Sequence, residues 1–174
     1  MARRPALMRE RLFMTEIHLD KIDLMIIRIL QTQGRISILE LADKVGLSPT
    51  PCGRRLKALE DRGVIRHYAA VVDYSLIGLT IEAVIYVRLE RQHGEHVAVF
   101  IDHINRLPEI YECLLVTGEY DYILRVRTHS PDTLKEFIIN KLTTIPCIAQ
   151  TVSMLVLEDR KMSETIALDA LVKT

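Results

Sequence analysis

The sequence contains no tryptophan, only three cysteines and no long uninterrupted run of apolar residues. Cys52, Cys113 and Cys147 form no CxxC pair and no metal-ligand spacing, so we interpret them as reduced thiols. Because the apolar runs are only a few residues long, no segment is expected to span a membrane. The basic start of the chain lacks an apolar core and a small-residue cleavage site, which argues against a signal peptide. These absences predict a cytoplasmic protein.

The motifs of the common enzyme classes are absent as well. No GxSxG, P-loop, GxGxxG or HExxH sequence occurs. The six histidines are scattered; His93 and His96 suggest a metal pair, but no clear third ligand accompanies them. We therefore expect no catalytic residue, no metal site and no cofactor.

The composition is that of a globular protein, with 49% hydrophobic and 26% charged residues in a chain of 174. This length holds one large domain or two small ones. The net charge of zero hides an asymmetry: residues 1–70 carry thirteen Lys and Arg against eight Asp and Glu, and residues 71–174 carry ten against fifteen. We expect two domains with different tasks, and a polyanionic partner on the N-terminal side.

The first half of the chain predicts three helices. Asp20 caps the first, and apolar residues then recur at helical spacing. A capping box at Ser37 starts the second, which stops near Gly46. Ser48 caps the third, whose first turn accepts two prolines and which ends at Gly63.

A short helix, a turn and a further helix form a helix-turn-helix candidate. In such a motif, residues in the first turns of the last helix reach base edges, and basic residues contact phosphates. On charge alone, an ordinary solvated helix face is an equal alternative. The extended, β-prone residues 64–72 resemble a wing. The candidates for contact with double-stranded DNA are Ser48, together with Thr50, Pro51, Gly53 and Arg54 for bases and Arg55, Lys57 and Arg62 for phosphates.

The second half alternates between strand and helix patterns in the order β-α-β-β-α-β. This order predicts a ferredoxin-like α+β domain, with both helices on one face of an antiparallel sheet. The expected strands are residues 80–90, 110–117, 120–128 and 148–157, and the helical stripes cover 97–107 and 134–142. Apolar residues on the uncovered face predict a partner subunit; they are Val84, Tyr86, Cys113, Leu115, Ile123 and Leu155.

The hairpin VTGEYDYIL, residues 116–124, carries an unexpected aspartate. Gly118 supplies the positive φ that a hairpin turn requires. Asp121 begins a strand where β-prone residues are expected. From the residues alone, a strand aspartate at a solvent edge and a ligand-binding aspartate are equal alternatives.

Three stretches closely resemble the Lrp/AsnC (feast/famine) transcriptional regulators: GRISILELADKVGLSPTPCGRRLKALEDRGVI, LPEIYECLLVTGEYDYIL and IPCIAQTVSMLVLE. The resemblance covers roughly residues 19–160. It implies a DNA-binding winged helix-turn-helix joined by a β-linker to an effector-sensing domain, and a nucleoid-associated protein. It also implies homodimers through paired sheets, often assembled into octamers. Arg55 lies at the family's recurrent recognition-helix arginine, whereas Gly53 occupies a position that larger residues often fill.

The resemblance also implies a site for a free amino acid at the hairpin. Asp121 would accept the ammonium, and backbone N–H groups around Gly118 would take the carboxylate. Two tyrosines would wall the pocket, and the apolar loop before the last strand favours leucine, methionine or a similar side chain. The implied effector residues are Gly118, Glu119, Tyr120, Asp121, Tyr122, Thr143, Thr144, Ile145, Pro146 and Ile148.

These inferences divide the chain into five parts. A disordered arm over 1–18 precedes the winged helix-turn-helix over 19–68. A β-linker over 69–79 leads to the effector-binding and oligomerisation domain over 80–160, and a tail covers 161–174.

Two alternatives stay open. Residues 1–18 match nothing in the family, so either Met14 is the start or the arm is a phosphate-binding tail. The alternative function is an amino-acid-binding allosteric regulator of a partner enzyme, with a helical head that binds protein. The arginines of the arm are Arg3, Arg4, Arg9 and Arg11.

Overall fold

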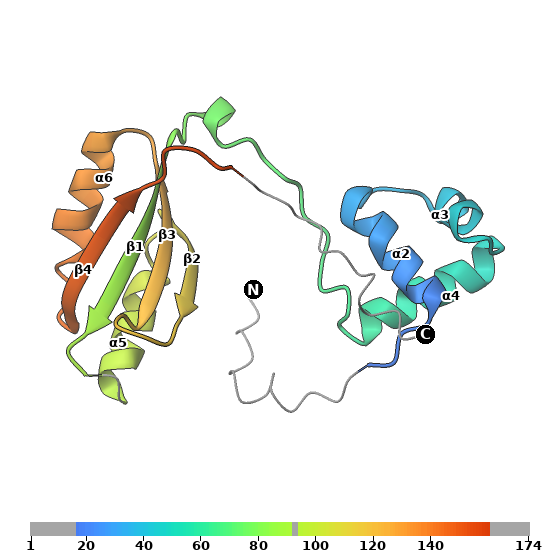
Figure 1. The fold of residues 1–174 in the computed structure, drawn as a ribbon, viewed down its shortest axis with the longest axis horizontal. Helices are drawn as coiled ribbons and strands as arrows, with labels where there is room; N and C mark the ends of the chain where they lie inside the picture. Colours follow the sequence, from blue (N-terminus) through green and yellow to red (C-terminus); the bar gives the residue numbers. More distant parts are fainter. Residues whose placement is uncertain (1–16, 92–93, 161–174) are drawn as a thin grey trace. The chain divides into compact units, whose positions relative to one another are not determined.

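The computed structural model describes residues 17–91 and 94–160, so most of the expected arm and the tail lie outside the described residues. The described chain divides into two compact units between Ala70 and Val71, each with its own hydrophobic core (Figure 1). No helix in this part of the chain is long and apolar enough to cross a membrane. All three cysteines are free thiols.

In its described residues the N-terminal unit has three helices, as the capping pattern predicts. The side chains of Asp20 and Ser37 each accept a hydrogen bond from the first turn that follows, and both capping boxes are complete. Gly46 ends the second helix with a φ of 72°, a conformation that glycine adopts without strain. The bounds are α2 (Lys21–Thr32), α3 (Ile38–Val45) and α4 (Pro49–Asp61).

The start of α4 differs from the expectation in one respect. Ser48 occupies the N-cap position, but its side chain makes no capping hydrogen bond. A capping side chain accepts from the second or third N–H of the helix, and Pro51 at the third position has none. The two prolines therefore fix the first turn, and Ser48 is exposed.

The segment between the units contains no strand. Residues 64–72 and the expected β-linker over 69–79 form no ladder within this chain; a single 3-10 turn, η1 (Ser75–Ile77), interrupts them. A lone β-prone segment has no partner for its backbone N–H and C=O groups, so its sequence preference alone does not make a strand. The residues expected to form the wing and the β-linker are therefore extended without a strand partner in the described part of the chain.

The C-terminal unit is a four-stranded antiparallel sheet in the order β2-β3-β1-β4, with two helices. The predicted β-α-β-β-α-β order is therefore correct, although both strands of the β2–β3 hairpin stop short of the turn. Helix α6 continues into a π-helical turn, η2. The bounds are β1 (Ile81–Leu89), α5 (Glu95–Ile104), β2 (Ile110–Leu115), β3 (Tyr122–Thr128), α6 (Pro131–Phe137), η2 (Ile138–Leu142) and β4 (Ile148–Leu155).

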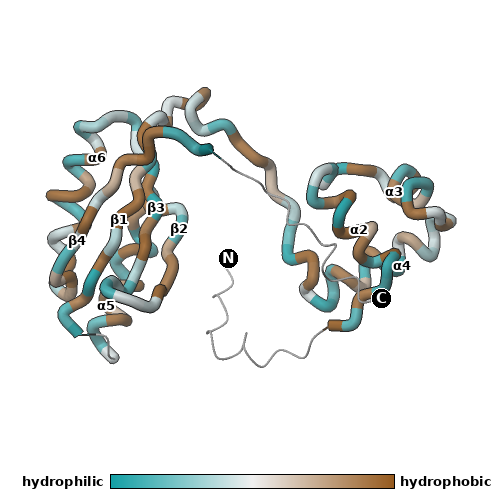
Figure 2. The backbone as a smooth tube through the Cα atoms, viewed as in Figure 1, coloured by the Kyte–Doolittle hydropathy of each residue, from teal (hydrophilic) through white to brown (hydrophobic). Residues whose placement is uncertain are grey.

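Both helices cover one face of the sheet (Figure 1). Alternate residues of β1, beginning with Ala83, are buried beneath them, together with Phe100 of α5 and Phe137 of α6. Apolar residues are concentrated along the strands and alternate with polar ones along the helices (Figure 2). This periodicity is what places one face of each element in the core.

No described element covers the other face of the sheet. Three of the residues expected on that face lie on the helix-covered face instead. Cys113 lies opposite Leu124, and Leu155 lies opposite Ala83, so both share the covered face with their partners; Leu115, opposite Tyr122, does the same. A register irregularity between Ile110 and Glu112 shifts β2 by one position, which reverses its faces. The apolar residues of the open face are Val84, Tyr86, Leu114, Ile123, Val152 and Met154.

Candidate DNA-binding and effector-binding sites

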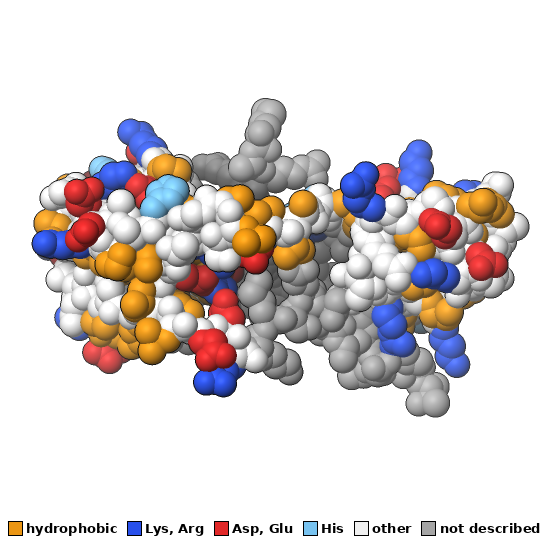
Figure 3. Space-filling view, turned by 90° about the horizontal axis from the view of Figure 1, so that it is seen from above, with side chains coloured by type: hydrophobic (Ala, Val, Ile, Leu, Met, Phe, Trp, Pro, Cys, Tyr) orange, Lys and Arg blue, Asp and Glu red, His pale blue; other side chains and the backbone are white. Residues whose placement is uncertain are grey.

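Helix α4 presents polar and basic side chains on the side away from the core. Thr50, Arg54 and Lys57 are exposed, whereas Cys52 and Leu59 of the same helix are buried. Within the described chain, neither Arg54 nor Lys57 forms an ion pair. Lys and Arg side chains project from several sides of this unit (Figure 3). Two unpaired cations on the third helix are therefore available to an anionic partner.

Arg55 has a different environment. Its Nη1 atom lies 2.6 Å from a carboxylate oxygen of Asp20 and 2.9 Å from one of Asp23. The backbone N–H of Asp23, opposed by partial desolvation and aided by the Arg55 guanidinium, lowers the pKa of Asp20. Arg55 thus ties α4 to the start of α2, and a contact with a phosphate has to compete with these two carboxylates.

The remaining candidates of α4 lie at its two ends and on its half-buried side. Pro51 and Gly53 are half-buried, and a Cβ on Gly53 would meet only the Ile38 side chain, at 3.9 Å. Arg62 follows the helix, and its Nη2 donates to the carbonyl of His18 at 3.1 Å. Gly53 is therefore not required by packing inside the unit.

Asp121 is fastened to the end of β1. Its carboxylate accepts the N–H of Leu89 at 2.7 Å, and its own N–H donates to the carbonyl of Val87 at 2.9 Å. The side chain is buried, which argues against the alternative of an aspartate at a solvent edge. Gly118 has a φ of 130°, which explains the glycine of the turn. A carboxylate has two oxygens and can accept several hydrogen bonds.

The two tyrosines beside Asp121 separate onto opposite faces of the sheet. Tyr122 is buried in the core with its ring 4.7 Å from that of Phe100. Tyr120 packs on Tyr86 of the open face, with 5.4 Å between ring centroids. Because β3 begins only at Tyr122, strand alternation does not extend back to Tyr120. The two rings therefore do not wall a common pocket within this chain.

The loop before β4 reaches the same end of the sheet as the hairpin. The N–H of Glu90 donates to the carbonyl of Cys147 at 3.0 Å, directly after the Leu89 contact with Asp121. In this loop Ile145 is buried and Ile148 is half-buried. The exposed residues are Thr143, Thr144 and Pro146; the two threonine hydroxyls donate to backbone carbonyls of the preceding turn.

No metal site is formed by the described residues, since no three His, Cys, Asp or Glu are placed to share an ion. His93 lies outside the described residues, so the suspected His93–His96 pair is not described.

A charged cluster on the open face was not predicted. Glu82 accepts hydrogen bonds from the Tyr111 hydroxyl at 2.6 Å and from Nε of Arg125 at 3.0 Å, and it pairs with Arg127 at 2.6 Å. Desolvation acts to raise the pKa of Glu82, but these hydrogen bonds and the two arginine charges outweigh it and lower the pKa. Desolvation, and then the bond to Glu82, raise the pKa of Tyr111 to about 12. The available signal was Glu82 in β1 together with Arg125 and Arg127 at alternate positions of β3.

Comparison with known proteins explains both halves of the chain. Residues 82–166 match the family model for the Lrp/AsnC ligand binding domain, and residues 19–66 match a winged helix-turn-helix DNA-binding model. The chain is 32% identical to the transcriptional regulator AzlB of Bacillus subtilis over 153 residues, which cover 88% of this chain and 98% of the relative. This chain belongs to the Lrp/AsnC family.

Other relatives agree with this assignment. The Bkd operon transcriptional regulator of Pseudomonas aeruginosa is 40% identical over 131 residues, covering 75% of this chain and 86% of that protein. A transcriptional regulator of Neisseria meningitidis, solved as a complex with L-methionine, superposes with a TM-score of 0.85 at 34% identity, covering 89% of this chain and all of that one. These relatives are transcriptional regulators. They confirm the expectation of a regulator that is not an enzyme, and they argue against the alternative of an allosteric regulator of a partner enzyme.

Proposed function

We propose that this Lrp/AsnC regulator reads double-stranded DNA through α4, with Thr50 and Arg54 at base edges and Lys57 at a phosphate. The supporting observation is that these side chains are exposed and unpaired within the described chain, at the start of the third helix of a helix-turn-helix. In this motif the first turns of the recognition helix enter the major groove. Ser48, Pro51, Gly53, Arg55 and Arg62 stay candidates for contact, and Arg55 contributes mainly by orienting α4. Such a protein acts in the cytoplasm, at the nucleoid.

Selection of bound fragments from genomic DNA tests this function. The parent is expected to enrich a pseudo-palindromic sequence, because a dimer presents two recognition helices related by a two-fold axis. Arg54→Ala should relax selection at one base position, at a cost of about 1–3 kcal/mol if its contact is bidentate. Unchanged selection after loss of Arg54, Arg55 and Lys57 together would sink the proposal.

The effector site proposed here lies at the end of the sheet that the hairpin and the loop before β4 share. Buried Asp121 accepts the ammonium of a free amino acid while it holds Leu89, and backbone N–H groups from Gly118 to Tyr120 take the carboxylate. Support comes from the methionine bound by the Neisseria relative. Because Tyr122 and Ile145 are buried, the accessible walls from this chain are Glu119, Tyr120, Thr143, Thr144 and Pro146, with Ile148 half-buried behind them. An aliphatic or sulfur-containing side chain such as leucine or methionine fits this surface best.

The open face of the sheet supports a homodimer. Leu114 and Met154 are 44% and 53% exposed there, beside the half-buried side chains of Tyr86 and Ile123. Apolar side chains gathered on one sheet face gain free energy when a second copy covers them. We propose pairing through this face, and higher assembly to octamers through the remaining exposed apolar residues.

A further inference from the structure

A cavity of about 500 Å³ lies at the end of the sheet where β1 begins. This volume falls within the range of small-molecule sites. Ile81, the first residue of β1, pairs with Thr128 at this end, whereas Val87 pairs with Tyr122 beside the hairpin. A nine-residue strand is roughly 25–30 Å long, so the cavity is separate from the proposed effector site.

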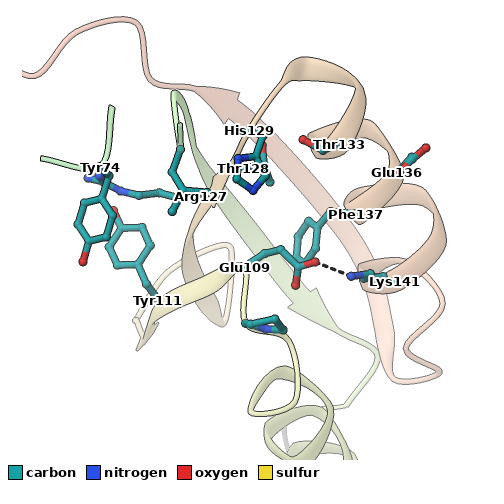
Figure 4. A pocket seen from close by; sticks show the side chains of 12 residues that line it. Tyr74, Glu109, Tyr111, Arg127, Thr128, His129, Thr133, Glu136, Phe137 and Lys141 are labelled. Carbon is teal, nitrogen blue, oxygen red and sulfur yellow. Dashed lines mark hydrogen bonds and ion pairs between the residues drawn. The ribbon is translucent and has the colours of Figure 1, made fainter. Parts of the chain in front are cut away.

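The cavity contains a buried acceptor that has no partner. Glu109 pairs with Lys141 of η2 through one carboxylate oxygen, and the other oxygen, Oε2, is buried without a hydrogen bond in the described chain. Figure 4 shows this ion pair beside the ring of Phe137. An ionised oxygen held out of water without a donor is unfavourable. A ligand that brings a donor would relieve this cost.

Arg127 and two tyrosine rings form another part of the lining. Arg127 lies near the rings of Tyr74 and Tyr111 (Figure 4), with its guanidinium carbon 4.3 Å and 5.1 Å from their centroids. It also pairs with Glu82. These contacts engage its positive charge, although its Nε is buried without a hydrogen-bond partner in the described chain. Among the carboxylates that line the cavity, Glu136 adds a second negative charge, on the exposed side of α6. The lining thus carries two carboxylates and two cations, Arg127 and Lys141. The donor that Oε2 of Glu109 lacks can come from an ammonium.

We propose that this cavity binds a small molecule with a primary ammonium and an apolar body. The ammonium donates to Oε2 of Glu109, and the apolar body lies against Phe137 and Leu79. The shared chemistry is that of an alkylamine or of the amino end of an aliphatic amino acid. This site is additional to the hairpin site and does not depend on it.

The cavity is partly built from the segment that leads out of the C-terminal unit. Tyr74 and Leu79 of this segment line it. The segment is also held by His129, whose Nδ1 lies 2.9 Å from the carbonyl of Gly78, and by Thr80, whose hydroxyl donates to the carbonyl of His129 at 3.0 Å. A ligand that contacts Leu79 stabilises this docked arrangement, so occupancy is coupled to the segment that joins the two units.

The test uses the full chain and two leucine methyl reporters in NMR spectra. Leu79 lines the cavity, and Leu89 lies at the Asp121 end of β1. Two probes are titrated: isoamylamine, which is leucine without its carboxylate, and leucine itself. The proteins are the parent, Glu109→Gln, and Asp102→Asn as a matched carboxylate change in an exposed ion pair outside the cavity.

Isoamylamine is expected to shift the Leu79 methyls in the parent and in Asp102→Asn. Its affinity should fall roughly ten- to a hundredfold in Glu109→Gln, because a charge-assisted hydrogen bond is lost. A Leu79 response to leucine as well, lost in the same variant, would show that the carboxylate is tolerated. The proposal is overturned if neither probe shifts Leu79, or if Glu109→Gln binds as tightly as the parent. A response at Leu89 alone would support the hairpin site and reject this one.

Discussion

The guanidinium of Arg55 in α4 lies 2.6 Å from the carboxylate of Asp20, the residue that caps α2. The same carboxylate accepts the backbone N–H of Asp23 at 2.8 Å. The Asp20 side chain therefore caps α2 and also binds α4 through Arg55. This arrangement ties α4 to the start of α2, and it gives Arg55 a structural role beside its proposed contact with DNA.

Arg55→Gln and Lys57→Gln should separate these roles. Lys57→Gln removes one exposed charge, so it should lower the salt slope of DNA binding by about one unit and leave thermal stability unchanged. Arg55→Gln should lower the melting temperature and weaken binding with a smaller change in slope, since its charge is shared with two carboxylates. Binding isotherms at several salt concentrations measure both. Equal slopes for the two variants would assign Arg55 to a phosphate instead.

The lowered pKa of Asp20 makes the N-terminal unit sensitive to acid. A carboxylate whose folded pKa lies below its ordinary value of 3.8 stabilises the fold above that pH, and the contribution is lost as pH falls through the folded pKa. Asp20→Asn keeps a good capping residue but removes the charge. The variant should therefore melt earlier than the parent near neutral pH, and the difference should shrink below pH 3.8. A difference that is the same at every pH would contradict this.

The sequence predicts the elements of this fold better than it predicts which residues meet. Helix starts at Asp20 and Ser37 follow from local hydrogen bonds, and local chemistry is readable in a sequence. Local chemistry does not predict which side chains of β2 face the helices, because a register shift of one residue reverses the two faces and leaves no local signature in the sequence. The cavity draws on residues from Tyr74 to Lys141, far apart in the chain, so only the folded structure reveals it.

A single substitution of the hairpin aspartate, Asp121, can distinguish a structural role of its carboxylate from a ligand-binding role. Asp121→Asn keeps an oxygen that accepts the N–H of Leu89, so the fold should persist. The missing charge should weaken binding of leucine or methionine roughly tenfold or more. Calorimetry on the parent, Asp121→Asn and the exposed control Asp102→Asn measures this. Equal affinity in all three would return the hairpin to a purely structural turn.

The open face of the sheet should govern assembly. Met154→Lys places a charge among the apolar side chains of this face, so the dimer should dissociate at concentrations where the parent is paired. Leu157→Lys is the control, since Leu157 is 90% exposed and lies beyond the end of β4. Light scattering measures the mass of both variants. A Met154→Lys protein that keeps the parent's mass would place the interface elsewhere.

Gly53 lies in the interior of α4. Substituting it should change the stability of the N-terminal unit and its recognition of DNA independently of each other. A Cβ there meets only Ile38 at an ordinary contact distance, so Gly53→Ala should stabilise the unit by about 0.5–1 kcal/mol through helix propensity. Ala58→Gly, at an exposed position of the same helix, should destabilise it by a similar amount. Urea denaturation measures both changes.

The same pair of variants tests why glycine stands at this position. If the backbone at Gly53 approaches a base, the added methyl should change the preferred base at one position of the selected site, whereas Ala58→Gly should leave the selected sequence unchanged. A Gly53→Ala protein that is more stable and selects the parent's sequence would remove Gly53 from the set of base-contacting residues. Thr50 and Arg54 would then carry that role on α4 without it.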